Sequence, residues 1–415
     1  MAISQETTPV GQEFWIVAVG CSKTEGGEAE KDKLLSHLNS SPLLCPKRSH
    51  DEEPLWQLSV PDGDRSLTFG SFDNLIRLTD DLQKCDSQLD SIVHRLERQF
   101  LELDPGAKFM VQFQRTTIPF ARYIRNWQWD DAKYPRSRSI VDNMTLLMSV
   151  VSKLDEECRN KTAQYNETKT QKSNLAKKDG ANLLSKDLMD VLTPDTVRMN
   201  GDSDDDFVMT EHLATVVVII PRGSEAEFLK SYEKMCDHVV PMSAKKFTAL
   251  DDKDGNSIWR VVMFKSAVEA FKKVSRERRL VPRDFEFSAD AYKKLCDQRE
   301  AVEDLVKKQC ERVRGLYSAA WSDAMVAWMH VKAMRVFVES VLRFGMPPSF
   351  ATFAFMPKPG TQANARKALA DILGKQQNSS GPYSAAKLAE AAGEDGDEYF
   401  PYVSLSFVPF TVARA

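Results

Sequence analysis

Hydrophobic residues along the chain follow two periods, and each period predicts its own kind of element. Apolar runs typical of buried strands occupy residues 13–20 (EFWIVAVG), 109–113, 213–220 (LATVVVII), 259–264 and 402–410. Helical spacing covers residues 72–103, 225–236, 267–279, 321–344 and 361–377. The Asp-Gly pair at 254–255 predicts a hairpin before residues 259–264. This mixture predicts an α+β fold.

Two long segments carry a heptad pattern, in which apolar positions alternate by three and four residues. The first predicts an uninterrupted helix over residues 140–177, roughly 57 Å long at about 1.5 Å per residue. Its positions are Ile140, Met144, Leu147, Val151, Leu154, Cys158, Lys161, Tyr165, Thr168, Lys172 and Leu175. The second has Tyr292, Leu295, Arg299, Val302, Val306, Gln309, Val313, Leu316 and Ala320. The pattern is typical of an antiparallel two-helix neck; the alternative is two unrelated surface helices.

These elements predict an elongated molecule in which the neck carries a small head. We expect a foot at residues 1–138, the first neck helix at 139–180, the head at 181–285, the second neck helix at 286–318, and the rest of the foot at 319–415. Both chain ends then belong to the globular foot. The head has the order strand, helix, hairpin, helix.

Composition and charge narrow the function classes. The chain has 415 residues, of which 42% are hydrophobic and 28% charged, so it is not a largely disordered protein. A net charge of −4 disfavours a dedicated nucleic-acid binder. The seven cysteines form no CxxC pair, which favours reduced thiols over disulfides or zinc. With no long apolar window and a polar N-terminus, we expect a cytoplasmic protein without direct membrane insertion.

Motifs for catalysis or cofactor binding are incomplete in this sequence. Residues 20–24 (GCSKT) follow a strand but lack the glycines of a phosphate-binding loop. Residues 251–256 (DDKDGN) resemble a calcium loop, yet Val262 occupies the position of its obligatory Glu. His330 lies on an apolar helix, where a hydrogen-bonded core or interface histidine is expected rather than a metal ligand. We therefore expect no catalytic residues, no metal and no cofactor.

One segment of the predicted head is strongly basic. Residues 265–283 contain seven Lys or Arg side chains and two Glu, a net charge of +5 by that count. A solvated helix face is the ordinary meaning of such a run, and a docking surface for an acidic partner is the functional one. The candidate partner-binding residues of the head are Lys272, Lys273, Arg276, Arg279 and Arg283.

A series of short sequence motifs, in a fixed order along the chain, resembles the C subunit of the vacuolar-type proton-pumping ATPase (V-ATPase). The most characteristic is WSDAMVAWMHVKAMRVFVESVLRFGMP at residues 321–347. The others are EFWIVAVGCSKT at 13–24, WQWDDAKYP at 127–135, LATVVVIIPR at 213–222, VVPMS at 239–243, RE at 276–277, RDFEF at 283–287 and EYFPYV at 398–403. The resemblance covers nearly the whole chain, although residues 358–397 are only loosely similar and Met242 departs from the pattern.

The resemblance implies a non-catalytic component of the peripheral stator, with head, neck and foot. The C subunit bridges the peripheral stalks, built from the E and G subunits, to the cytosolic N-terminal domain of the membrane-bound a-subunit. Its release accompanies reversible separation of the catalytic and membrane sectors. The implied location is cytoplasmic, peripheral on vacuolar membranes and other endomembranes, and free in the cytosol when the pump is disassembled. Actin is left open as a partner, and no nucleic acid is expected.

Three aromatic residues before the first neck helix are candidates for the foot interface. Trp127, Trp129 and Tyr134 are of the types that often anchor interfaces, and the alternative is that they form the foot core. The alternative function class is a stand-alone coiled-coil scaffold or a cytoskeletal linker. That class explains the heptad pattern but not the ordered series of family motifs.

Overall fold

The chain folds into two compact units, each with its own sheet and core. The computed structural model describes residues 10–21, 32, 36, 38, 55–62, 66–71, 74–177, 183–184, 186–201, 207–248, 250, 255–346, 349–357, 359–377 and 400–412. Unit 1 comprises residues 1–162 and 311–415, and unit 2 comprises residues 163–310. The predicted mixture of helix and sheet is confirmed. The finer division into foot, neck and head stays a prediction.

Unit 1 is built on a four-stranded antiparallel sheet that joins distant parts of the sequence. Its order is β10 (Val403–Phe407), β1 (Phe14–Gly20), β9 (Phe350–Phe355) and β2 (Leu55–Gln57). At the centre, Ile16 pairs with Leu405 on one side and Ala354 on the other. The strands predicted at residues 13–20 and 402–410 are therefore direct neighbours.

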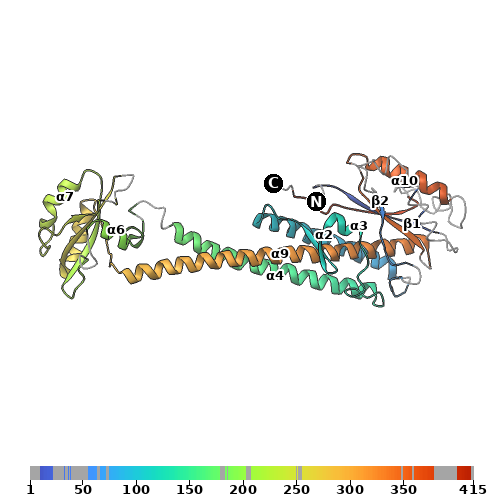
Figure 1. Ribbon diagram of the computed structural model, residues 1–415, viewed down its shortest axis with the longest axis horizontal. Helices are drawn as coiled ribbons and strands as arrows, with labels where there is room; N and C mark the ends of the chain where they lie inside the picture. The colour runs from blue at the N-terminus through green and yellow to red at the C-terminus, as the bar shows by residue number, and fades with distance from the viewer. Residues whose placement is uncertain are drawn as a thin grey trace. The chain divides into compact units, whose positions relative to one another are not determined.

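Both faces of this sheet are covered, which explains why β1 is an unbroken apolar run. Trp15, Val17 and Val19 share a core with α10 (Gln362–Gln377), which lies beside the sheet in Figure 1. On the opposite face, the ring of Phe14 contacts Phe120 at the start of α3 (Phe120–Arg125), with 5.6 Å between ring centroids. A hairpin of β3 (Met110–Phe113) and β4 (Thr116–Pro119) precedes α3.

Three long helices contribute to unit 1. α2 (Leu75–Leu103) buries its apolar stripe, and α9 (Ala289–Phe344) is buried along most of residues 313–341. α4 (Ile140–Lys177) buries several predicted heptad positions, among them Leu147, Val151 and Cys158. The helices predicted from the two heptad patterns are thus confirmed. The second continues without a break through residues 321–344, where the sequence pattern had suggested a separate helix.

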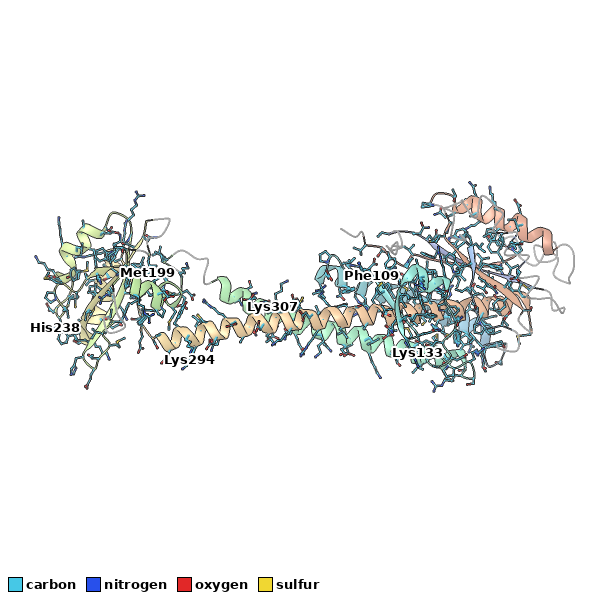
Figure 2. The ribbon with its side chains drawn as sticks, in the orientation of Figure 1. Phe109, Lys133, Met199, His238, Lys294 and Lys307 are labelled. Carbon is cyan, nitrogen blue, oxygen red and sulfur yellow. The ribbon has the colours of Figure 1, made fainter. Side chains whose placement is uncertain are left out.

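Unit 2 has a second four-stranded antiparallel sheet, whose side chains are drawn in Figure 2. Its order is β6 (Lys245–Lys246), β7 (Ser257–Phe264), β5 (Leu213–Ile220) and β8 (Val281–Arg283). Alternate residues of β5 enter two cores: Val216 and Val218 pack with α7 (Glu225–Ser231) and α8 (Val268–Glu277), whereas Val217 and Ile219 pack with α5 (Leu188–Val191) and α6 (Pro194–Met199). This two-sided burial favours its β-branched composition.

Several predicted boundaries differ from the structure. The helix expected at residues 225–236 ends at Ser231 and continues as the 3₁₀ helix η4 (Tyr232–Lys234). A second 3₁₀ turn, η5 (Lys265–Ala267), precedes α8. The strand predicted at residues 259–264 lies in β7 and pairs with β6, which precedes it; residues 251–254 of the predicted Asp-Gly turn lie outside the described residues. The strand β9 was not predicted.

Candidate interaction surfaces

The predicted basic residues of unit 2 fall into two groups with different environments. Lys273, Arg276 and Arg279 are exposed on or just after α8, together with Arg278. In the part of the chain that the structure describes, no carboxylate forms an ion pair with these four side chains. Their charges are therefore available to a partner.

Lys272 lies one helical turn before Arg276 but is buried where α8 meets the end of β8. Lys272 is 8% exposed, and its ammonium nitrogen lies 2.7 Å from a carboxylate oxygen of Glu269 and 2.7 Å from one of Asp284. Hydrogen bonds to Asp284 and Glu269 outweigh burial and raise the pKa of Lys272. Because Asp284 follows β8 directly, Lys272 ties the helix to the end of that strand.

Arg283 is likewise used inside unit 2. Its guanidinium donates hydrogen bonds to the backbone carbonyls of Leu184 and Lys186, at 3.0 and 3.1 Å. It thereby fixes the segment that leads into α5. Of the five basic residues selected from the sequence, the structure leaves three facing solvent and gives two an internal contact.

Backbone geometry at the end of α8 is unusual. Arg279 has a φ of 60°, in the left-handed region that favours glycine. The amide of the next residue, Leu280, donates to the carbonyl of Ser275 at 2.9 Å and closes the helix end. An arginine at this position costs about 1 kcal/mol relative to glycine. The partial negative charge at the C-terminus of a helix stabilises nearby cations. The arginines at the end of α8 therefore have a stabilising role that does not require a partner.

The three predicted aromatic residues of unit 1 surround one histidine. Ring centroids of Trp127, Trp129 and Tyr134 lie 5.3, 5.0 and 4.7 Å from that of His330 on α9. Trp127 and Tyr134 are buried, and the indole of Trp129 donates to the carbonyl of Tyr134 at 2.7 Å. The alternative interpretation, a core role, fits this arrangement, and partner binding by these residues stays a prediction.

His330 is a hydrogen-bonded core residue, as the sequence suggested. Its Nδ1 lies 2.7 Å from the carbonyl of Val326, and its Nε2 lies 3.1 Å from the backbone nitrogen of Asp130. Only a neutral ring with the proton on Nδ1 satisfies both contacts. Burial lowers the pKa of His330 to about 4. Among the described residues, no cluster of His, Cys, Asp or Glu side chains suits a metal ion.

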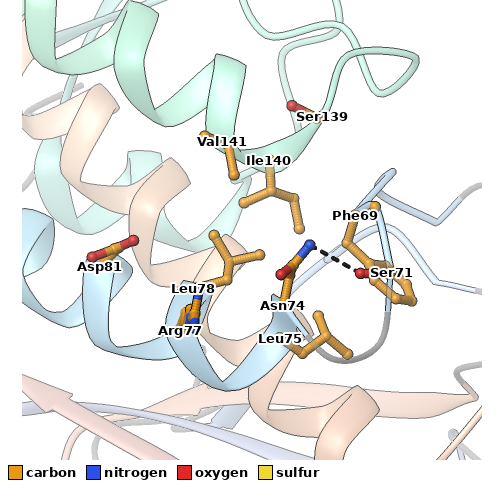
Figure 3. Close-up of a pocket in the computed structure, with 11 residues that line it drawn as sticks. Phe69, Ser71, Asn74, Leu75, Arg77, Leu78, Asp81, Ser139, Ile140 and Val141 are labelled. Atoms are coloured by element: carbon orange, nitrogen blue, oxygen red, sulfur yellow. Dashed lines mark hydrogen bonds between the residues drawn. The ribbon is translucent and has the colours of Figure 1, made fainter.

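A hollow of about 350 Å³ lies where α2 and α4 begin (Figure 3). Leu75, Leu78 and Ile140 give it an apolar floor, and the amide of Asn74 donates to the hydroxyl of Ser71 at 2.9 Å. The described lining contains one Arg and one Asp but no Lys, His or Cys. Its chemistry therefore suits apolar contact better than catalysis.

A protein-family model for the C subunit of the V-ATPase matches residues 14–403. The chain belongs to the V-ATPase C-subunit family. The sequence resemblance is thereby confirmed, and the family makes this chain a component of the V-ATPase. The stand-alone scaffold is not favoured, because the match spans both units and not the heptad segments alone.

Named relatives agree with the family model. The V-type proton ATPase C subunit from Dictyostelium discoideum is 32% identical over 345 residues, covering 82% of this chain and 87% of the relative. The V-type proton ATPase C subunit, form 1, from Bos taurus is 27% identical over 400 residues, covering 94% and 96%.

A structural comparison finds the cytoplasmic N-terminal domain of the V-ATPase I-subunit, which is a homolog of the a-subunit. It covers 86% of this chain and 98% of that chain at 12% identity, and its TM-score of 0.25 is too low to indicate a shared fold. Within the described residues, no helix has the length and hydropathy needed to span a membrane.

Proposed function

We propose that this chain is a non-catalytic stator component of the V-type proton pump. In this role it bridges the E–G peripheral stalks to the cytosolic N-terminal domain of the a-subunit. The observation that carries the proposal is the family match over residues 14–403. The protein would act on the cytosolic side of vacuolar membranes and other endomembranes, and be free in the cytosol after disassembly.

The division into two units is consistent with a two-ended connector. Each unit has its own sheet and its own buried cores, so each can present a separate binding surface. A connector with two moderate interfaces binds tightly as a whole yet dissociates when one contact is weakened. Such a balance suits a component whose release separates the catalytic sector from the membrane sector.

For unit 2, we propose that the exposed basic residues Lys273, Arg276 and Arg279 contact an acidic face of an E–G stalk. Rim charges of this kind speed association and select partners by complementary potential. Lys272 and Arg283 then support the surface from inside: Lys272 holds α8 to the end of β8, and Arg283 fixes the segment before α5.

Binding of the full chain to a purified E–G heterodimer tests the stalk contact. We expect the triple variant Lys273→Glu, Arg276→Glu, Arg279→Glu to bind at least about tenfold more weakly at physiological salt, about 1.4 kcal/mol. A control with the same change in charge replaces the exposed residues Arg222, Lys230 and Lys234, which lie around α7, by Glu. Equal loss in both variants, or loss in neither, would contradict the assigned surface.

The wider role is tested separately in cells. Deletion of this chain should leave vesicle membranes unable to acidify, and the full chain should capture both the E–G heterodimer and the N-terminal domain of the a-subunit in pull-down. Capture of neither partner by the folded chain would overturn the bridging role while leaving family membership intact.

A further inference from the structure

His94 on α2 lies between two carboxylates, and each of its ring nitrogens faces one of them. Nε2 lies 3.2 Å from an oxygen of Asp90, and Nδ1 lies 3.3 Å from an oxygen of Glu97. A neutral imidazole carries a single N–H and can donate to only one of these oxygens; the other contact would place two lone pairs together. The geometry therefore fits a doubly protonated imidazolium. His330, whose partners are a carbonyl and an amide, shows the opposite arrangement.

Glu97 connects this histidine to residues near the end of the chain. Its carboxylate is fully buried and accepts hydrogen bonds from the backbone amides of Thr411 and Val412, at 3.1 and 3.2 Å, and from the Thr411 hydroxyl at 3.1 Å. The preceding residue Phe410 stacks on Trp321 with 5.5 Å between ring centroids. Phe410 also contacts the rings of Phe109 and Phe120, and its carbonyl accepts from the Gly11 amide at 2.9 Å. Phe410 is therefore anchored in the core, whereas the amides of Thr411 and Val412 are held by the buried carboxylate of Glu97.

We propose that His94 is a pH-sensitive clamp for Thr411 and Val412. When protonated, it neutralises the buried charge of Glu97 and keeps that carboxylate aimed at the two amides. When His94 loses its proton, the buried charge of Glu97 is no longer neutralised, and residues 411–412 detach beyond the anchored Phe410 and admit water.

The groups that face His94 come from three elements. On α2 they are the carboxylates of Asp90 and Glu97, and on the C-terminal segment the uncharged Thr411 hydroxyl, 3.4 Å from Nδ1. On α9 the ring of Trp328 lies 5.9 Å from the His94 ring, and the ammonium of Lys332 sits 4.5 Å over that indole while binding Asp86. Lys332 shares Asp86 with the guanidinium of Arg335, which also pairs with Glu339, so both cations of α9 have carboxylate partners of their own.

The direction of the pH effect follows from these contacts. Burial alone lowers the pKa of His94, but the hydrogen bonds and charges of Glu97 and Asp90 outweigh it and raise the pKa above its ordinary value of 6.5. A raised pKa means that the clamp is complete below about pH 6.5 and weakens as pH rises through the pKa of the clamped histidine. Burial alone would raise the pKa of Glu97, but the hydrogen bonds that its carboxylate accepts outweigh this effect and lower the pKa. The carboxylate therefore stays charged over the pH range in which His94 titrates.

Amide hydrogen exchange of Thr411 and Val412 in the full chain tests the clamp. We expect protection, corrected for intrinsic exchange, to be constant below about pH 6.5 and then to fall about tenfold per pH unit until the raised pKa of His94 is passed. A titration of the His94 ring by NMR should give a midpoint above 6.5. The variant His94→Gln should show low protection at every pH, and Asp90→Asn should move the midpoint to lower pH.

The variant His238→Gln is the matched control, because His238 belongs to unit 2 and its ring contacts Phe264 of the same unit. It should leave the exchange profile unchanged. Protection that is independent of pH in the wild-type chain, an unaltered profile in His94→Gln, or a His94 midpoint below its ordinary pKa would each overturn the proposal. Thr411→Val, which keeps both amides but removes the hydroxyl, should lower protection while the pH dependence remains.

Discussion

The ammonium nitrogen of Lys332 lies 3.0 and 3.2 Å from the two carboxylate oxygens of Asp86, and both residues are buried. The same carboxylate accepts from the Trp328 indole at 2.7 Å and from the Arg335 guanidinium at 2.6 Å. One acid on α2 therefore satisfies three donors of α9. Burial lowers the pKa of Lys332, which makes this partner indispensable to its charge.

Replacing Asp86 by Ala should destabilise the protein strongly. The substitution leaves Lys332 as a buried cation without its carboxylate and removes the acceptor of Trp328, so we expect a loss of roughly 3–5 kcal/mol in the free energy of unfolding. Urea denaturation followed by tryptophan fluorescence measures it. Asp81→Ala is the control, because Asp81 on the same helix is exposed and pairs with Lys84 at 3.8 Å. Its loss should stay within about 0.5 kcal/mol, and equal losses would show that the buried pair is not decisive.

Tyr317→Phe tests a junction of three helices. The buried Tyr317 hydroxyl lies 2.9 Å from the Thr162 hydroxyl of α4 and donates to Gln99 of α2 at 3.1 Å. Removing it leaves the ring in place but strips both neighbours of a partner, which should lower the free energy of unfolding by about 1–2 kcal/mol. In the background of Thr162→Val the same change should have a smaller effect. Full additivity of the two substitutions in a double-mutant cycle would argue against the contact.

The buried His330 predicts a loss of stability in acid. Its pKa of about 4, against an ordinary 6.5, means that the unfolded chain binds the proton more readily, so stability falls as pH drops from 6.5 to 4. The contribution of this residue is about 3 kcal/mol over that range. His330→Gln should be less stable at neutral pH and lose less on acidification. The control His212→Gln, at an exposed position, should follow the wild-type curve, and an unchanged slope in His330→Gln would contradict the prediction.

Arg279→Gly separates stability from binding. Because the φ of 60° suits glycine, we expect the variant to be more stable by up to about 1 kcal/mol. If Arg279 contacts a stalk, the same variant binds the E–G heterodimer less well. Arg278→Gly is the neighbouring control, since its φ of −91° is ordinary and glycine there should slightly destabilise. Unchanged affinity in Arg279→Gly would remove this residue from the proposed surface.

The elements predicted correctly are those whose own residues carry the signal. β1 and β5 are covered on both faces, so nearly every position is apolar, and α2 has a long one-sided stripe. β9 (FATFAF) follows closely on the apolar end of α9, and a short apolar run there does not distinguish strand from helix. β2 and β8 have only three residues each, too few for any period to show.

The environment of each candidate residue depends on contacts with residues that are distant in the sequence. Helical spacing puts Lys272 and Arg276 on the same side of α8, so the sequence does not distinguish them. The contact that buries Lys272 is made with Asp284, beyond the end of the helix. The amide facing His330 is 200 residues away, and the hydroxyl facing His94 is 317 residues away. Such pairings arise only when the sheet and helices have assembled, which is why the clamp has no signature in the chain.

The pairing of β1 with β10 dictates when each unit can form during synthesis. Unit 2 is complete once residue 310 has left the ribosome, and its sheet then depends on nothing that follows. β1 precedes the other described strands in the chain, yet both of its neighbours, β9 and β10, follow unit 2. An apolar strand therefore stays unpaired until β9 and β10 have been made, and chaperones that bind such segments are expected to engage the nascent chain near Trp15 during that interval.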